Sequence, residues 1–319
     1  MSLVGAFAAS HAPGITGRPS LPPAVESEPI FRAYEALRDR LEAARPDVLV
    51  VVSPEHWANF FLDNMPSFCI GIADEFLGPT DEKFVNIPRR GIRGHARLAR
   101  VLAEGIAEEV DLSTSQEMAL DHGVMLPLHL LQSELPAIPI IVNCLAGMPA
   151  PLHRCHALGV AIRRMVDRWP ERVALLGTGG LSHWPAMPES GQIGIDFDRR
   201  FLDAFVNGRI ESFLHYPKEK LEAEAGLGGH DPYLDYHRRS SEWRARINTR
   251  LSARACMVYR LCGCGAADWG NRSLRFFGSG DRVQKSVIPI PTKIANRTGD
   301  SFCMFPPCGL VRHVLLSHL

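Results

Sequence analysis

Short, almost continuous apolar stretches recur along the first two thirds of the chain, and each ends in a polar turn or loop. They predict buried strands, because a strand covered on both faces carries apolar residues at consecutive positions rather than at alternate ones. The four clearest stretches are residues 3–10 (LVGAFAAS), 46–57 (PDVLVVVSPEHW), 137–146 (AIPIIVNCLA) and 172–183 (RVALLGTGGLSH).

Between these stretches, apolar residues recur at helical spacing with charged residues on the opposite side, which is typical of amphipathic helices. The helical segments are residues 28–46, 91–109 and 151–171. Strands that alternate with helices predict an α/β fold in which helices cover both faces of one sheet.

Composition narrows the range of partners. A chain of 319 residues with 46% hydrophobic content can bury a large core. Lys plus Arg equals Asp plus Glu at 35 each, so net charge gives no reason to expect nucleic acid or an anionic membrane as partner. The N-terminal segment has no basic region typical of a signal peptide, and no apolar run is long enough to span a bilayer. We therefore expect a cytoplasmic protein that acts on a small molecule.

Four histidines lie at the ends of predicted strands or in a loop, namely His11, His56, His122 and His183. Ligand sites of α/β sheets gather at the carboxyl ends of strands, so these imidazoles are expected to converge on one crevice. Any one of them alone would be as typical of an ordinary turn residue. Two histidines and one carboxylate form the usual donor set of a non-haem Fe(II) site that activates O₂, with His11 and His56 as the nitrogen donors. A catalytic zinc would accept the same ligands, so ligand type alone does not separate the two metals.

Several blocks identify the family. SHAPG, VSPEHWANFFLDNMPSFCIGIAD, ALDHGVMLPL, IPIIVNCLAGMPAPLHRCHALG and LLGTGGLSHWP, in that order, resemble class III extradiol dioxygenases. The similarity covers about the first seven tenths of the chain. It is strongest to the branch that acts on 3-(2,3-dihydroxyphenyl)propionate or 2,3-dihydroxycinnamate.

The resemblance implies an Fe(II) enzyme that opens a catechol ring with O₂ beside, rather than between, the two hydroxyls, and that forms a homo-oligomer. By position, His11 and His56 match the iron ligands, His122 matches a proton donor and His183 a proton acceptor. Opposite roles for two imidazoles require surroundings that separate their pKa values. Asp121, next to His122, is a possible orienting partner for it, and a solvated loop aspartate is the alternative.

The family's carboxylate ligand belongs to a motif H-E-I-[K/R]-T-W, from which this chain departs. His230 is kept, but Asp231 stands in place of Glu, and nothing after it matches. We assign Asp231 as the third metal ligand by position, although it is shorter by one methylene and would need the backbone to move closer.

A reading-frame slip is a hypothesis that explains this departure. With a suitable choice of codons, removing two nucleotides from DNA that encodes HEIRTWITIA gives HDPYLDYHRR, the sequence of residues 230–239. Composition changes at the same place: from Pro232 onward lie fourteen of the 35 basic residues but five of the 35 acidic ones. We therefore divide the chain into a catalytic domain, 1–231, and an atypical basic tail, 232–319. Two alternatives to an active dioxygenase stay open: an impaired homologue with a damaged tail, and a zinc hydrolase.

Overall fold

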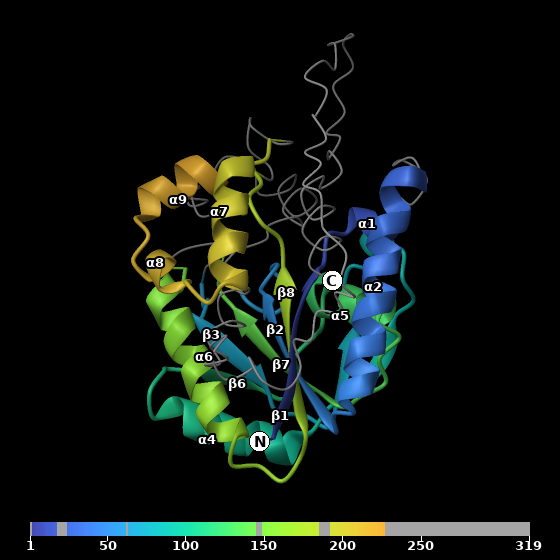
Figure 1. Ribbon diagram of the computed structural model, residues 1–319. Helices are drawn as coiled ribbons and strands as arrows, with labels where there is room; N and C mark the ends of the chain where they lie inside the picture. Colours follow the sequence, from blue (N-terminus) through green and yellow to red (C-terminus); the bar gives the residue numbers. More distant parts are fainter. Residues whose placement is uncertain (1, 18–23, 62, 145–148, 185–191, 227–319) are drawn as a thin grey trace, which may run out of the picture.

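A computed structural model describes residues 2–17, 24–61, 63–144, 149–184 and 192–226, and its centre is a six-stranded sheet (Figure 1). The strand order is β1-β8-β2-β7-β3-β6. β1, β8, β2 and β7 run parallel, β3 is antiparallel to β7, and β6 is parallel to β3. The strands are β1 (Leu3–Ser10), β2 (Val48–Pro54), β3 (Phe68–Gly71), β6 (Ser113–Ser115), β7 (Ala137–Val142) and β8 (Val173–Gly179).

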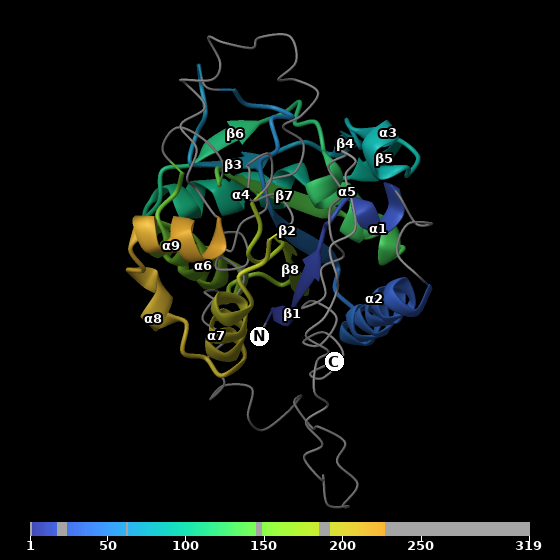
Figure 2. The same cartoon turned by 90° about the horizontal axis from the view of Figure 1, so that it is seen from above.

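Helices cover both faces of this sheet, as the alternating pattern predicts, and Figure 2 shows them in two groups. One group comprises α4 (Ala96–Ala107), α6 (Leu152–Val166), α7 (Ile195–Val206), α8 (Glu211–Leu214) and α9 (Lys218–Ala225). The other comprises α2 (Ala24–Ala44), α3 (Glu82–Val85) and α5 (His122–Leu130), with the short α1 (Gly14–Gly17) beside α3. A small antiparallel pair, β4 (Glu75–Gly78) and β5 (Arg90–Arg93), packs with the second group.

The central strand β2 explains why the apolar stretches are continuous. Val50 and Val52 belong to the core on the α4, α6 and α7 side, whereas Leu49 and Val51 belong to the core on the α2 and α5 side. All four side chains are fully buried. A strand with a core on each face needs apolar residues at every position, which is the pattern seen in the sequence.

The structure confirms the four predicted strands and places a helix in each of the three predicted helical segments, but residues 91–93 of the second segment belong to β5 instead. The apolar pattern did not predict β3, which is four residues long and lies inside the block that follows His56. It also missed the helices α7 to α9, and it predicted a loop at His122, where α5 begins. The proposed division at residue 231 and the tail 232–319 lie outside the described residues. Within the described part of the chain, no helix has the length and apolar character needed to cross a membrane.

Candidate metal centre

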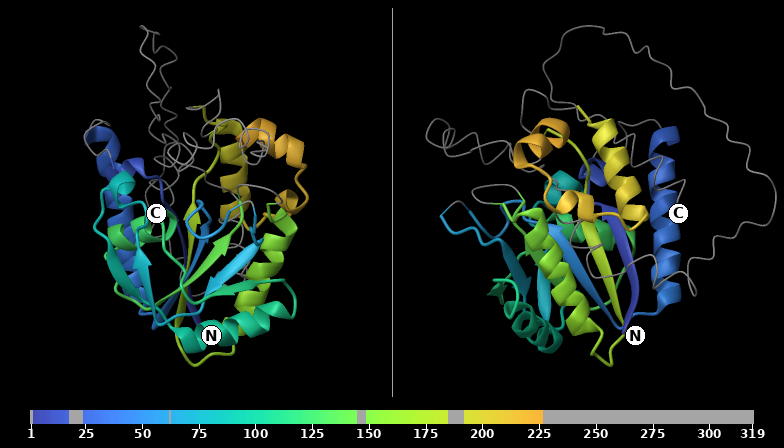
Figure 3. Two further views of the ribbon diagram at one scale, coloured as in Figure 1. Left: turned by 180° about the vertical axis from the view of Figure 1, so that it is seen from behind. Right: turned by 60° about the vertical axis from the view of Figure 1, so that its left-hand side comes forward.

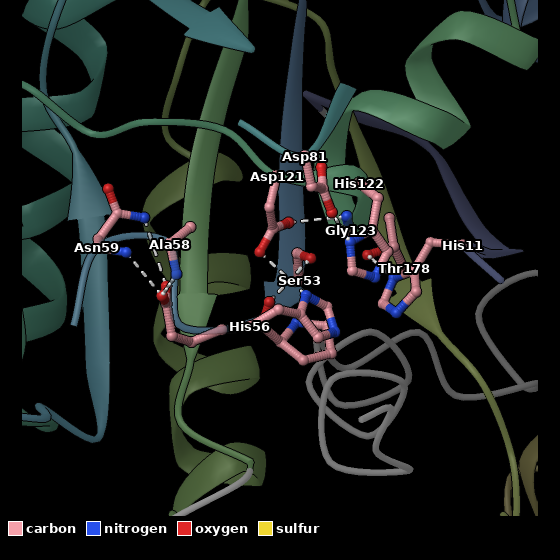
Figure 4. Close-up of polar contacts among 12 residues, drawn as sticks. His11, Ser53, His56, Ala58, Asn59, Asp81, Asp121, His122, Gly123 and Thr178 are labelled. Atoms are coloured by element: carbon pink, nitrogen blue, oxygen red, sulfur yellow. Dashed lines mark hydrogen bonds and ion pairs between the residues drawn. The ribbon is translucent and has the colours of Figure 1, made fainter. Parts of the chain in front are cut away.

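Three of the four predicted histidines converge at one end of the sheet (Figure 4). His11 follows the end of β1, His56 lies two residues beyond β2, and His122 is the first residue of α5. Their ring centroids are 4.3 to 5.4 Å apart, and one ring nitrogen from each lies within 4.8 Å of the others. All three side chains are buried. The structure thus places these imidazoles together where the carboxyl ends of parallel strands meet, as the strand pattern predicts.

The Nδ1 atom of each imidazole lies within hydrogen-bond distance of a neighbouring side chain, on the side of the ring away from the other two histidines' Nε2 atoms. The partner of His11 is the Thr178 hydroxyl, at 3.1 Å from Nδ1 to Oγ1. His56 Nδ1 lies 3.0 Å from Oδ2 of Asp121, and His122 Nδ1 lies 2.5 Å from Oδ2 of Asp81. A hydrogen bond on one ring nitrogen fixes the ring and directs the other nitrogen forward, as in most protein metal sites.

The Nε2 atoms of the three histidines are suited to bind a metal ion. The Nε2 atoms of His11, His56 and His122 are buried, and none has a hydrogen-bond partner among the residues that the structure describes. Buried polar atoms are rarely left unsatisfied, because each loses its hydration without gaining a new bond. Three such nitrogens around one point form a donor set for a transition metal.

The structure pairs Asp121 with a different histidine from the one that the sequence predicted. Asp121 does not serve as the hydrogen-bond partner of its neighbour His122. Its Oδ2 atom meets His56, while its Oδ1 atom accepts a bond of 2.7 Å from the backbone of Gly123 and so caps the start of α5. Asp81, at the start of α3, is the partner of His122. The alternative of a solvated Asp121 is also wrong, because its side chain is buried.

Glu55 shapes the turn that carries His56. Its carboxylate accepts hydrogen bonds from the backbone N–H groups of Ala58 at 2.6 Å and Asn59 at 2.8 Å. The amide side chain of Asn59 in turn pairs with the N–H and the carbonyl of Ala119, at 2.8 and 3.0 Å. These bonds tie the His56 turn to the segment that leads into His122.

The pKa values of His11 and His56 are shifted in opposite directions. Burial lowers the pKa of His11 well below its ordinary value, and the nearby charges of His56, His122 and His183 lower it further. Burial acts to lower the pKa of His56, but the carboxylates of Asp121, Glu55 and Asp81 together outweigh it, and the pKa of His56 is raised. The same contact lowers the pKa of Asp121 despite its burial. His11 is therefore held neutral, the form that binds a metal.

His183 lies beside this cluster but not in it. It is half-buried in the loop after β8, and its Nδ1 atom lies 3.0 Å from the carbonyl oxygen of Leu181. The loop starts next to His11, because the backbone N–H of His11 donates to the carbonyl of Gly179, the last residue of β8, at 3.3 Å. Asp231, the predicted third ligand, lies outside the described residues.

Comparison with known proteins agrees with this geometry. The family model described as "Catalytic LigB subunit of aromatic ring-opening dioxygenase" matches residues 5–233. A protein of Cupriavidus necator is 34% identical over 73% of this chain and 72% of its own length. One of Cupriavidus pinatubonensis is 38% identical over 73% of each chain, and one of Rhodococcus rhodochrous is 27% identical over 70% of this chain and 83% of its own. All three are named 2,3-dihydroxyphenylpropionate/2,3-dihydroxicinnamic acid 1,2-dioxygenase. With its buried histidine cluster and a family match over most of its length, this chain belongs to the LigB family of aromatic ring-opening dioxygenases.

Proposed function

We propose that this enzyme is Fe(II)-dependent and opens the ring of a catechol that bears a three-carbon acid side chain, either 3-(2,3-dihydroxyphenyl)propionate or 2,3-dihydroxycinnamate. The substrate class rests on the names of the relatives, which match this chain over most of its length. The observation that carries the metal site is the convergence of three buried Nε2 atoms without hydrogen-bond partners among the described residues.

His11 and His56 are the proposed metal ligands, with Asp231 as the third by its place in the family motif. The imidazoles are the nitrogen part of the two-histidine, one-carboxylate set, which leaves positions free for both substrate oxygens and O₂. When bound, Fe(II) would pass electron density from the catechol to O₂ and would lower the pKa of the coordinated hydroxyl. Thr178 and Asp121 fix the rings of the two ligands from behind.

His183 and His122 are the proposed proton acceptor and proton donor. His183 is half-buried on the loop that starts next to His11, and from there it is proposed to receive the hydroxyl proton of an entering catechol. His122 lies deeper, fully buried, with Asp81 on its Nδ1 atom. The Asp81 carboxylate fixes the orientation of the imidazole, so that His122 can donate a proton to the oxygen that leaves the ring carbon. The reaction breaks the ring bond beside the two hydroxyls, takes up both atoms of O₂ and yields a 2-hydroxy-6-oxo-dienoate.

Two other functions compete with an active Fe(II) dioxygenase. Three histidine nitrogens would also suit zinc, so a zinc hydrolase is the competing enzyme, although the family match favours the dioxygenase. The second alternative is an impaired homologue with a tail foreign to the family. In its support, the family match ends at residue 233, two residues beyond Asp231.

One experiment tests the proposed activity and the proposed metal. The full chain is purified, stripped of metal and loaded anaerobically with either Fe(II) or Zn(II), and O₂ uptake is recorded with 3-(2,3-dihydroxyphenyl)propionate. We expect O₂ uptake and a yellow ring-fission product with Fe(II) alone. Catechol without the side chain is the matched control for the proposed substrate and should be cleaved less efficiently. Absence of O₂ uptake in both metal forms would contradict the proposed activity of this chain.

A further inference from the structure

Two backbone segments far from the metal centre in sequence support the loop that carries His183. The loop follows β8, and α7 lies beside the end of that strand in both views of Figure 3. The side chains of Ser182 and Asp198 are buried, at 3% and 2% exposure. Neither residue was singled out by the sequence motifs as part of the site.

Asp198 binds Ser182 twice. Its Oδ1 atom accepts a hydrogen bond of 2.8 Å from the Ser182 backbone N–H, and its Oδ2 atom accepts one of 2.9 Å from the Ser182 hydroxyl. The same hydroxyl accepts a bond of 2.6 Å from the N–H of Gly194, the residue that precedes α7. Ser182 is thus fixed through both its main chain and its side chain to the first turn of α7.

The end of α9 holds the next residue. The backbone N–H of His183 donates to the carbonyl of Ala225 at 3.1 Å. Gly226 follows with a φ of 67°, and a Cβ there would lie 2.4 Å from the His183 carbonyl oxygen. Glycine is therefore required for the left-handed backbone and for the close approach.

The burial of the Asp198 carboxylate costs free energy, because the charged form loses its hydration. Burial raises the pKa of Asp198 to about 6, although both bonds from Ser182 act to lower it. An apolar residue would fill the space without that cost but could not accept two hydrogen bonds with fixed directions. The bonds specify the orientation of the loop, which is what a side chain that must meet one atom of a substrate requires.

We propose that Asp198 is a positioning residue for the reaction, which acts through Ser182 to hold His183 where it meets the catechol hydroxyl. The inference rests on the proposed role of His183 as proton acceptor. Asp198 itself touches neither metal nor substrate in this scheme. Its contribution is therefore expected to exist only while His183 is present.

A double-mutant cycle in the full chain tests this dependence. Asp198→Ala, His183→Ala and the double variant are loaded anaerobically with excess Fe(II), and kcat and KM are measured. We expect Asp198→Ala to keep its iron and its KM and to lose kcat by ~10-fold or more, as for other lost supports of a site residue. The double variant should be no slower than His183→Ala, because residues that act through one group are not additive. Asp198→Asn, which keeps a carbonyl acceptor for the Ser182 N–H, should recover most of the loss. The control is Asp196→Asn, an exposed carboxylate of the same helical turn.

A second measurement does not need turnover. The visible spectrum of 4-nitrocatechol reports loss of its hydroxyl proton, so its ionisation is followed against pH in the same Fe(II)-loaded variants. We expect ionisation of the bound probe to move to higher pH in Asp198→Ala and in His183→Ala, with no further shift in the double variant. Additive losses in kcat and in ionisation would overturn the positioning role and leave His183 as the acceptor. Normal turnover and ionisation in His183→Ala would instead remove the acceptor assignment, and the positioning role with it.

Discussion

The Oδ2 atom of Asp81 lies 2.5 Å from Nδ1 of His122, forty-one residues later in the chain. This pair gives the proposed proton donor a partly buried carboxylate of its own, separate from the Asp121 that holds the proposed ligand His56. Two neighbouring residues, Asp121 and His122, therefore belong to two different carboxylate–imidazole pairs. Each of the two imidazoles thus has its own carboxylate to orient its ring.

Removing the Asp81 carboxylate should slow the reaction without releasing the metal. We expect Asp81→Ala to retain iron and to lose ~10–100-fold in kcat, because His122 would lose the hydrogen bond that orients its ring. The kcat of Asp81→Asn should lie between those of Asp81→Ala and the unmodified chain, since the amide oxygen can accept the bond but carries no charge. The exposed neighbour Glu82, changed to Gln, is the control. Iron content and kcat together check this, and a variant with normal kcat would contradict a role for the pair.

The proposed ligands are tested by metal retention. His11→Ala and His56→Ala should each fail to retain iron, because each removes one of three protein ligands. Inductively coupled plasma analysis of protein loaded with Fe(II) and then desalted measures the bound fraction. Stoichiometric iron in either variant would show that the residue is not a ligand.

His122→Ala and His183→Ala should keep their iron but lose turnover. The expected fall in kcat is ~10²–10⁴-fold, the usual effect of a lost acid or base. The same metal analysis, combined with O₂ uptake, separates this outcome from loss of a ligand. If His122→Ala released the metal, the buried cluster would be a three-histidine site, and the donor role of His122 would be wrong.

Asp198 gives a pH dependence of stability whose sign follows from burial. Its pKa of about 6 in the folded chain lies above its ordinary value of 3.8, so the folded state favours the protonated carboxyl. The stabilising effect is fully present below pH 3.8 and is lost as pH rises through 6. Asp198→Asn lacks this loss, so its free energy of unfolding relative to the unmodified chain should rise by about 2 kcal/mol between pH 4 and pH 7. Paired urea unfolding curves at the two pH values measure the difference, and an equal difference at both would contradict it.

The last prediction concerns Asp231 and residues 232–319. If a slipped frame left Asp231 in place of glutamate, the chain as written should bind Fe(II) weakly and turn over slowly. Restoring the frame, so that H-E-I-R-T-W is encoded from His230 onward, should increase both iron affinity and O₂ uptake. Equal iron binding and activity in the two proteins would refute the damaged-tail hypothesis and make Asp231 a competent ligand.

The sequence alone determined which segments form the buried strands and which histidines follow them. Those features depend on local periodicity, and a strand buried on both faces must be apolar at every position, as Val50 and Val51 are in β2. The position of His11 and His56 just beyond strands was enough to predict that they meet, because parallel strands end at the same edge of a sheet.

Only the tertiary structure decided which carboxylate serves which imidazole. Asp121 is adjacent to His122 in sequence but pairs with His56, because it caps α5 with its side chain turned toward the end of β2. Asp81 and Asp198 lie 41 and 16 residues from the groups they hold, His122 and Ser182. Contacts of that kind depend on how loops and helices from separate parts of the chain pack together, and neither periodicity nor spacing along the sequence contains that information.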